Sequence, residues 1–170
     1  MTNINYGREL QQKIAEYPNR LIQAHESAKG FEMVSISVDR QDKDFYRQLR
    51  DYKNNKLANH EVLVRTALGV YKKLRTEVEA DEASLLELIA NAPEGLSGDR
   101  RQSLLISENQ LTQTMTEIKL QISLLESHLR TITQSKKMID EAMKQQKAAS
   151  LGPIFAELTR QVQAIKRGET

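Results

Sequence analysis

Several residue types are scarce in this 170-residue chain, and each absence excludes a class of structure. There is no cysteine, which excludes disulfide frameworks, thiolate metal sites and cysteine nucleophiles. Proline and glycine number only three and seven, too few for a disordered, collagen-like or all-β chain. Tryptophan is absent and aromatic residues make up 5%, so the apolar content is mostly Leu, Ile, Val and Ala. This composition is typical of an elongated helical protein with a narrow apolar seam.

The chain also lacks a charge excess and long apolar runs. Its 25 basic and 23 acidic residues nearly cancel, which argues against a strongly basic nucleic-acid coat or an acidic mimic. No stretch approaches the roughly 18 consecutive apolar residues of a membrane span. Met1–Leu10 is polar, unlike a signal peptide. We therefore expect a soluble, cytoplasmic protein without a membrane span.

An apolar heptad repeat dominates the second half of the chain. Every seventh position is Leu or Ile, and the position four residues later is mostly apolar. The two sets are Leu104, Leu111, Ile118, Leu125, Ile132 and Ile139, and Glu108, Met115, Ile122, Leu129, Lys136 and Met143. This alternating 4-3 spacing puts both sets on one stripe of an α-helix. It predicts a helix from Asp99 to near Ser150.

A second heptad stripe precedes the first. It comprises Leu57, Val64, Tyr71, Val78 and Leu85, with His60, Ala67, Leu74, Asp81 and Leu88 three residues after each. The chain's only Pro–Gly cluster, residues 91–99, separates the two stripes, and Ser97 or Asp99 can cap the second helix. The predicted fold class is therefore all-α: a long antiparallel coiled-coil helical hairpin with its tip near Gly95, and short N- and C-terminal helices packed at its base.

Two details of this hairpin can be predicted further. In an antiparallel hairpin, the numbers of two facing residues add up to a constant, here about 190 for a turn centred near residue 95. This pairs Lys73 with Glu117 and Arg65 with Glu126 across the seam. Residues 42–55 are also helix-like, but their apolar face is out of register with the Leu57 stripe. A stutter or a break is therefore expected near Asn54–Asn55.

The chain divides into three predicted segments. Residues 1–40 form an N-terminal helical segment with an extended connector, residues 41–151 the hairpin with its turn at about 91–99, and residues 152–170 an amphipathic C-terminal helix. Pro18 predicts a kink or two short helices in the first segment. Met33–Val38 alternates apolar and polar residues, and is either a connector or a strand that pairs with another chain.

No catalytic or ligand-binding motif is apparent. None of the three histidines, His25, His60 and His128, has a second histidine four residues later or a glutamate three residues before it. Gly-rich phosphate loops and nucleophile elbows are missing as well. We expect no enzymatic activity, no catalytic residues, no cofactor and no metal site. His60 lies on the seam, where it would set the register, and His128 flanks the seam and should be solvated.

Partner-binding residues are predicted near the hairpin tip. Apolar residues outside the heptad positions widen the stripe on both arms, which implies further helices or a partner chain. Residues 61–99 hold four basic and eight acidic groups, so the acidic cluster there is either a docking patch for a basic surface or a solvated face. The expected partner-binding residues are Leu86, Ile89, Leu105 and Ile106, with the acidic cluster Glu77, Glu79, Asp81 and Glu82.

A basic strip offers an alternative contact. Its members are Arg130, Lys136, Lys137, Lys144 and Lys147. Their spacing could neutralise the phosphates of a nucleic acid, although it is also ordinary for a charged helix surface.

The leading hypothesis is a non-enzymatic helical scaffold, adaptor or assembly subunit of a larger protein complex. The alternative is a small helical subunit that contacts the nucleic-acid backbone in a ribonucleoprotein or DNA-processing complex. Self-association of two hairpins into a dimer is compatible with either.

Overall fold

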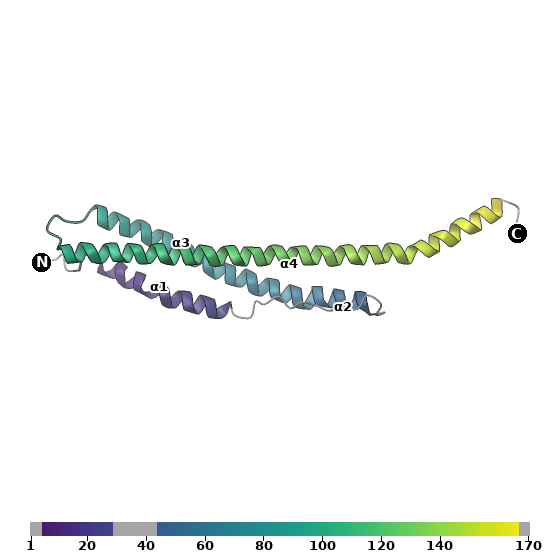
Figure 1. The fold of residues 1–170 in the computed structure, drawn as a ribbon, viewed down its shortest axis with the longest axis horizontal. Helices are drawn as coiled ribbons and strands as arrows, with labels where there is room; N and C mark the ends of the chain where they lie inside the picture. The colour runs from purple at the N-terminus through teal and green to yellow at the C-terminus, as the bar shows by residue number, and fades with distance from the viewer. Residues whose placement is uncertain (1–4, 29–43, 167–170) are drawn as a thin grey trace. The chain divides into compact units, whose positions relative to one another are not determined.

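The computed structural model describes residues 5–28 and 44–166, with the backbone alone for residues 146–156 and 165–166. Its elements are α1 (Arg8–Ser27), α2 (Phe45–Asp51), the π-helix η2 (Tyr52–Leu57), α3 (Ala58–Ala90) and α4 (Gly98–Lys166) (Figure 1). Among these described residues there is no strand. The predicted all-α helical hairpin is confirmed, formed by α3 and α4. Met33–Val38 lies outside the described residues.

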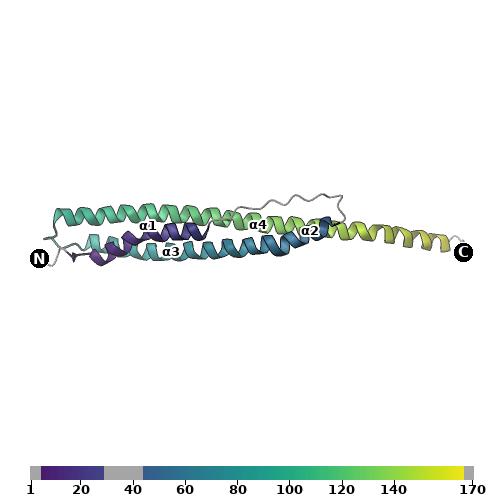
Figure 2. The ribbon, with the colours of Figure 1, turned by 90° about the horizontal axis from the view of Figure 1, so that it is seen from below.

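The chain groups into two compact units. The first contains Met1–Met33 and His60–Arg130, and the second contains Val34–Asn59 and Thr131–Thr170, so that α4 contributes to both. In the first unit, α1 runs beside α3 and the first part of α4 (Figure 2). α1 is antiparallel to α3, because contacts pass from Tyr6–Leu88 at one end to His25–Tyr71 at the other.

The core of the first unit is the seam that the heptads predict. In this unit, every residue of the two first-named heptad sets is buried, because it faces the neighbouring helix rather than water. These residues are Val64, Tyr71, Val78 and Leu85 on α3, and Leu104, Leu111, Ile118 and Leu125 on α4. Ser107 and Thr114 of α4 are buried as well, although the second predicted set did not include them. They widen the buried face of α4, which contacts α1 as well as α3 in this part of the bundle.

The predicted charge pairs across the seam are wrong. Glu117 pairs with His25 of α1, and Arg65 pairs with Glu61 one turn away on its own helix. Lys72 and Glu126 do form an ion pair between α3 and α4, at 3.9 Å. The rule that facing residue numbers add up to a constant does not identify which charges pair. Glu117, for example, pairs with His25 of α1 and not with a residue of α3.

The position of α1 differs from the prediction. The helix was expected at the base of the hairpin, but it lies along the half next to the turn. The Tyr6 hydroxyl donates to the Leu88 carbonyl, and the Gln11 amide donates to Ser103 and Ser107 of α4. Gly7 allows the close approach, since it has φ +74° and a Cβ there would lie 2.9 Å from Leu104.

The caps and helix ends follow local sequence signals to different extents. The Ser97 hydroxyl accepts from the Arg100 N–H and caps α4, one of the two predicted caps. Pro18 does not divide α1, which is one helix of 20 residues. The prediction that the second helix ends near Ser150 and a separate helix begins at residue 152 is wrong, because α4 continues through Gly152 and Pro153 to Lys166. A proline removes one helical hydrogen bond, but the backbone on both sides of Pro18 and Pro153 is helical.

In the second unit, the phase change predicted near Asn54–Asn55 is present. It takes the form of the π-helix η2, whose wider turns accommodate an extra residue without breaking the helix. As a result Tyr52 and Leu57 are both buried, as are Ile132 and Ile139 of α4. An ion pair between Lys53 and Asp140 joins the two helices.

Candidate functional site

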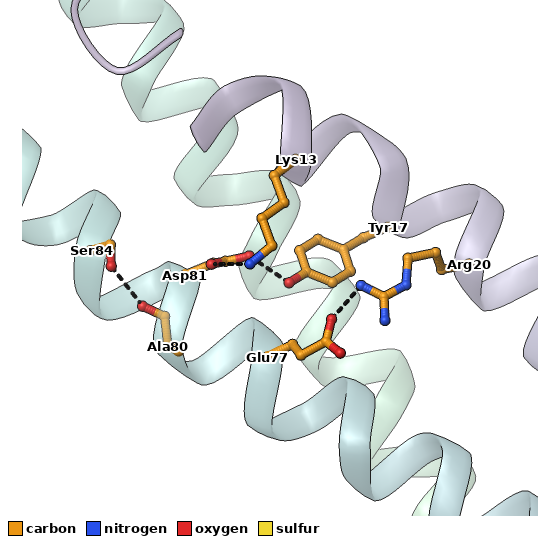
Figure 3. A network of polar contacts seen from close by, with 7 residues as sticks. All are labelled: Lys13, Tyr17, Arg20, Glu77, Ala80, Asp81 and Ser84. Carbon is orange, nitrogen blue, oxygen red and sulfur yellow. Dashed lines mark hydrogen bonds and ion pairs between the residues drawn. The ribbon is translucent and has the colours of Figure 1, made fainter. Parts of the chain in front are cut away.

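The acidic cluster predicted as a docking patch is partly occupied by α1 (Figure 3). Asp81 is only 5% exposed, and its carboxylate accepts hydrogen bonds from the Tyr17 hydroxyl at 2.5 Å and the Lys13 ammonium at 3.1 Å. Arg20 donates a hydrogen bond to Glu77, which lies one turn before Asp81 on α3. The Arg20 guanidinium also lies 5.3 Å from the centre of the Tyr17 ring. These contacts hold α1 against α3.

The same contacts shift ionisation. Burial, aided by the hydrogen bond to Asp81, raises the pKa of the Tyr17 hydroxyl, which therefore remains a donor at neutral pH. The hydrogen bond from Arg20 lowers the pKa of the Glu77 carboxyl and raises that of the Arg20 guanidinium. Both groups are consequently charged at neutral pH, where their attraction stabilises the docked helix.

Of the four acidic residues, Glu79 is exposed and Glu82 is half-buried, so these two remain accessible. Sequence reasoning missed the internal partners Lys13, Tyr17 and Arg20. A signal was present, since these three lie at spacings of four and three on one face of α1, opposite two carboxylates spaced by four on α3.

His25 connects three helices at the far end of α1. Its Nδ1 shares a hydrogen bond of 2.6 Å with the Tyr71 hydroxyl of α3, and its Nε2 lies 3.4 Å from the Glu117 carboxylate of α4. Burial, together with the charge of Glu117, raises the pKa of Tyr71 to about 12. This cluster marks the level of the hairpin at which α1 ends.

A second histidine cluster lies on the seam. The rings of His60 and His128 are 6.4 Å apart and nearly perpendicular. Burial, together with the neighbouring His128, lowers the pKa of His60. His60 is half-buried at its heptad position, and the prediction that His128 is solvated is wrong, since it is half-buried beside His60.

Near the tip, the predicted apolar binding residues separate onto two sides. The Lys72–Glu126 ion pair marks one face of the hairpin. Leu86 and Leu105 lie whole heptads away from Lys72 and Glu126, so they share that face, where they are 44% and 45% exposed. Half-buried Ile89 lies one turn from Leu86. We call Leu86, Ile89 and Leu105 the outer patch.

The outer patch faces away from α1. Ser103 and Ser107 show which side of α4 contacts α1, because both accept from Gln11. Leu105 lies midway between them in sequence, which places it about 160° around the helix. Ile106 is 50% exposed, but it lies closer to the α1 side than Leu105 does. The structure therefore does not group Ile106 with the other three.

A second apolar surface lies where α1 ends. Val70 and Leu63 precede Glu77 of α3 by one and two heptads, and Leu124 follows Glu117 of α4 by one heptad. Glu77 and Glu117 both contact α1, so these residues continue the stripes along which α1 packs. Val70 lies beside the last turns of α1. We call Leu63, Val70, Leu120 and Leu124 the open groove. Their side chains are 40% to 52% exposed.

The open groove adjoins a cavity of about 350 Å³. The cavity lies between the last turns of α1 and the adjoining part of α3, and Ala24, Ser27 and Val70 help to line it. Val70 of the open groove is therefore also part of the wall of this cavity.

The residues of the predicted basic strip are divided between the two units. Arg130 is exposed in the first unit, and Lys137 and Lys144 are exposed in the second. Lys136 is half-buried, and the side chain of Lys147 lies outside the described residues.

The chain matches no protein-family model, no curated protein and no solved structure. Within 5–28 and 44–166, no helix has an apolar stretch long enough to cross a membrane. The same residues bring together no group of three or more potential metal ligands.

Proposed function

We propose that this protein is a non-enzymatic helical scaffold or assembly subunit that binds a protein partner through the outer patch. The observation that carries the proposal is the exposure of Leu86 and Leu105 on one face of the hairpin. The seam is already filled by the heptad residues, so these leucines contribute little to the core. Neighbouring apolar side chains on such a surface favour burial against another protein.

The chemistry around the patch favours a partner with basic residues. Glu79 is exposed one heptad before Leu86, on the same stripe of α3. A carboxylate at the rim of an apolar patch steers and orients a basic partner surface. The contacts of α1 on the opposite face hold the two arms in place, which reduces the entropy lost on binding.

A matched pair of variants tests this proposal. Leu105→Lys places a charge in the patch, whereas Thr112→Lys places the same charge one heptad away at another exposed position of α4. The tagged protein is purified from its own cells, co-purifying proteins are identified, and binding is remeasured with the purified partner. We expect Leu105→Lys to weaken binding by tenfold or more at unchanged helicity, and Thr112→Lys to leave it intact.

Two results would contradict the proposal. Equal affinity of the wild type and Leu105→Lys would show that the patch does not bind the partner. Loss of helicity in Leu105→Lys would show that the residue belongs to the core. Treating half of each sample with nuclease separates this proposal from nucleic-acid binding through basic residues, because only the latter is lost with the nucleic acid.

A further inference from the structure

The end of α4 carries an apolar stripe that does not continue the seam of the hairpin. After Met143 the heptad positions of the seam hold no large apolar residue, since the next ones are Gln146, Ser150, Pro153, Glu157 and Arg160. Leu158 and Val162 stand at other positions of the helix, and their side chains are 51% and 50% exposed. Because this stripe is out of phase with the seam, the packing of the hairpin does not account for it.

The stripe makes the end of α4 an amphipathic helix. The backbone is helical without a break through Gly152 and Pro153 to Lys166. Successive residues of an α-helix are rotated by about 100°, so the large apolar residues after position 150 share an arc of similar width. They are Leu151, Ile154, Phe155, Leu158, Val162 and Ile165. Glu157 and Arg160 lie outside this arc, where they form an ion pair of 2.6 Å.

Basic residues flank this stripe at both ends. Lys144 and Lys147 precede it, and Lys166 and Arg167 follow it. Residues 144–167, which we call the terminal segment, contain five basic residues and one acidic residue, so the segment is far more basic than the nearly neutral chain. The single acidic residue forms its ion pair with an arginine of the same segment. The terminal segment therefore combines an apolar stripe with an excess of positive charge.

We propose that the terminal segment binds the surface of a membrane that contains anionic lipids. The interface of such a membrane supplies both complements, because the acyl chains accept the apolar stripe and the lipid phosphates attract the flanking cations. A nucleic acid would attract the cations but would leave the stripe exposed. A helix with one apolar side lies in the plane of the interface and does not span the membrane. The inference is independent of the proposed function, because it does not use the outer patch.

Binding of the full chain to lipid vesicles tests the inference. We expect the wild type to co-sediment with vesicles that contain about one-third phosphatidylserine, and to bind vesicles of phosphatidylcholine alone at least about tenfold more weakly. Leu105→Lys, in the outer patch, should bind the anionic vesicles as the wild type does. Failure of the wild type to bind the anionic vesicles, or equal binding to both kinds of vesicle, would overturn the inference.

A matched pair of variants separates insertion of the stripe from attraction between charges. Leu158→Lys adds a positive charge but removes an apolar side chain, so it should lower the affinity for anionic vesicles at least about tenfold at unchanged helicity. Gln163→Lys adds the same charge at an exposed position outside the stripe, and should bind as tightly as the wild type or more tightly. Undiminished binding of Leu158→Lys, or an equal loss in both variants, would show that the stripe does not insert.

Insertion of the stripe can also be measured directly, because the chain has no native cysteine. A polarity-sensitive fluorophore attached to Val162→Cys should shift its emission to the blue when anionic vesicles are added. The same fluorophore attached to Gln163→Cys should remain in water and keep its emission. No shift at position 162, or an equal shift at position 163, would contradict the orientation of the helix in the interface.

Discussion

At the scale of single residues, Asp81 has the least expected environment. It occupies a heptad position between the buried residues Val78 and Leu85, where an apolar side chain would normally stand. A buried carboxylate is tolerated only when it is hydrogen-bonded and paired, and here Tyr17 and Lys13 supply those contacts. Asp81 therefore fixes where along α3 the helix α1 docks.

Tyr17→Phe is expected to destabilise the protein although it removes only one hydroxyl. Tyr17 is fully buried and donates to Asp81, so the variant leaves a buried carboxylate with one donor fewer. The free energy of unfolding should fall by about 1–3 kcal/mol in urea denaturation. Glu79→Gln is the control, because it changes an exposed carboxylate of the same helix and should alter stability by less than about 0.5 kcal/mol. Equal effects of the two variants would show that the bond contributes nothing.

His60 should make stability depend on pH. Burial and His128 lower the pKa of His60 below its ordinary value of 6.5, so below that pH the unfolded chain binds a proton that the folded chain does not. Stability is therefore full above pH 6.5 and decreases as the pH falls towards the lowered pKa. Thermal unfolding between pH 7 and 5 should show this slope, and His60→Gln should flatten it. The idea fails if the wild type and the variant have the same slope.

At the scale of whole helices, periodicity predicted the arms of the hairpin well and the position of α1 poorly. Heptad positions such as Val64 and Leu111 are buried because burial on a helix depends mainly on which face a residue occupies. The place where α1 docks depends instead on particular pairs such as Arg20–Glu77, between residues 57 apart in the sequence. No periodic pattern links such distant positions.

The sequence predicted the outer patch and the open groove only in part. The sequence indicated that residues such as Leu105 and Leu124 are surplus to the seam. It did not indicate which of them lie beyond the end of α1, because that depends on where α1 docks. The end of α4 was misjudged because a separate helix was expected from residue 152, whereas Gly152 and Pro153 lie within one continuous helix.

The π-helix η2 leads to an element-scale prediction. Deletion of Asn55 should convert η2 to regular α-helix and rotate Tyr52 by about 100° relative to Leu57. Tyr52 would then leave its buried position, and Lys53 would turn away from Asp140. Amide hydrogen exchange in α2 should accelerate strongly while exchange in α3 stays slow. Asn55→Ala is the control, because it keeps the chain length and should leave both exchange rates unchanged. Unaltered exchange in the deletion variant would mean that the extra residue does not set the helical phase of α2.

At the scale of the whole molecule, the chain has more apolar surface than its own fold covers. The outer patch and the open groove lie on different sides of the hairpin, so covering one of them leaves the other exposed.

The contacts of α1 also have a consequence for how the chain is made. Tyr6 bonds to a residue 82 positions later, Lys13 to one 68 later and Gln11 to one 96 later. α1 therefore has no binding site until α3 and the first part of α4 have been translated. The arms of the hairpin meet across a short turn and can close early, because the loop between them is small. Although α1 precedes α3 and α4 in the chain, it is thus expected to be the last of the three to pack, and its apolar face must stay clear of other nascent chains until then.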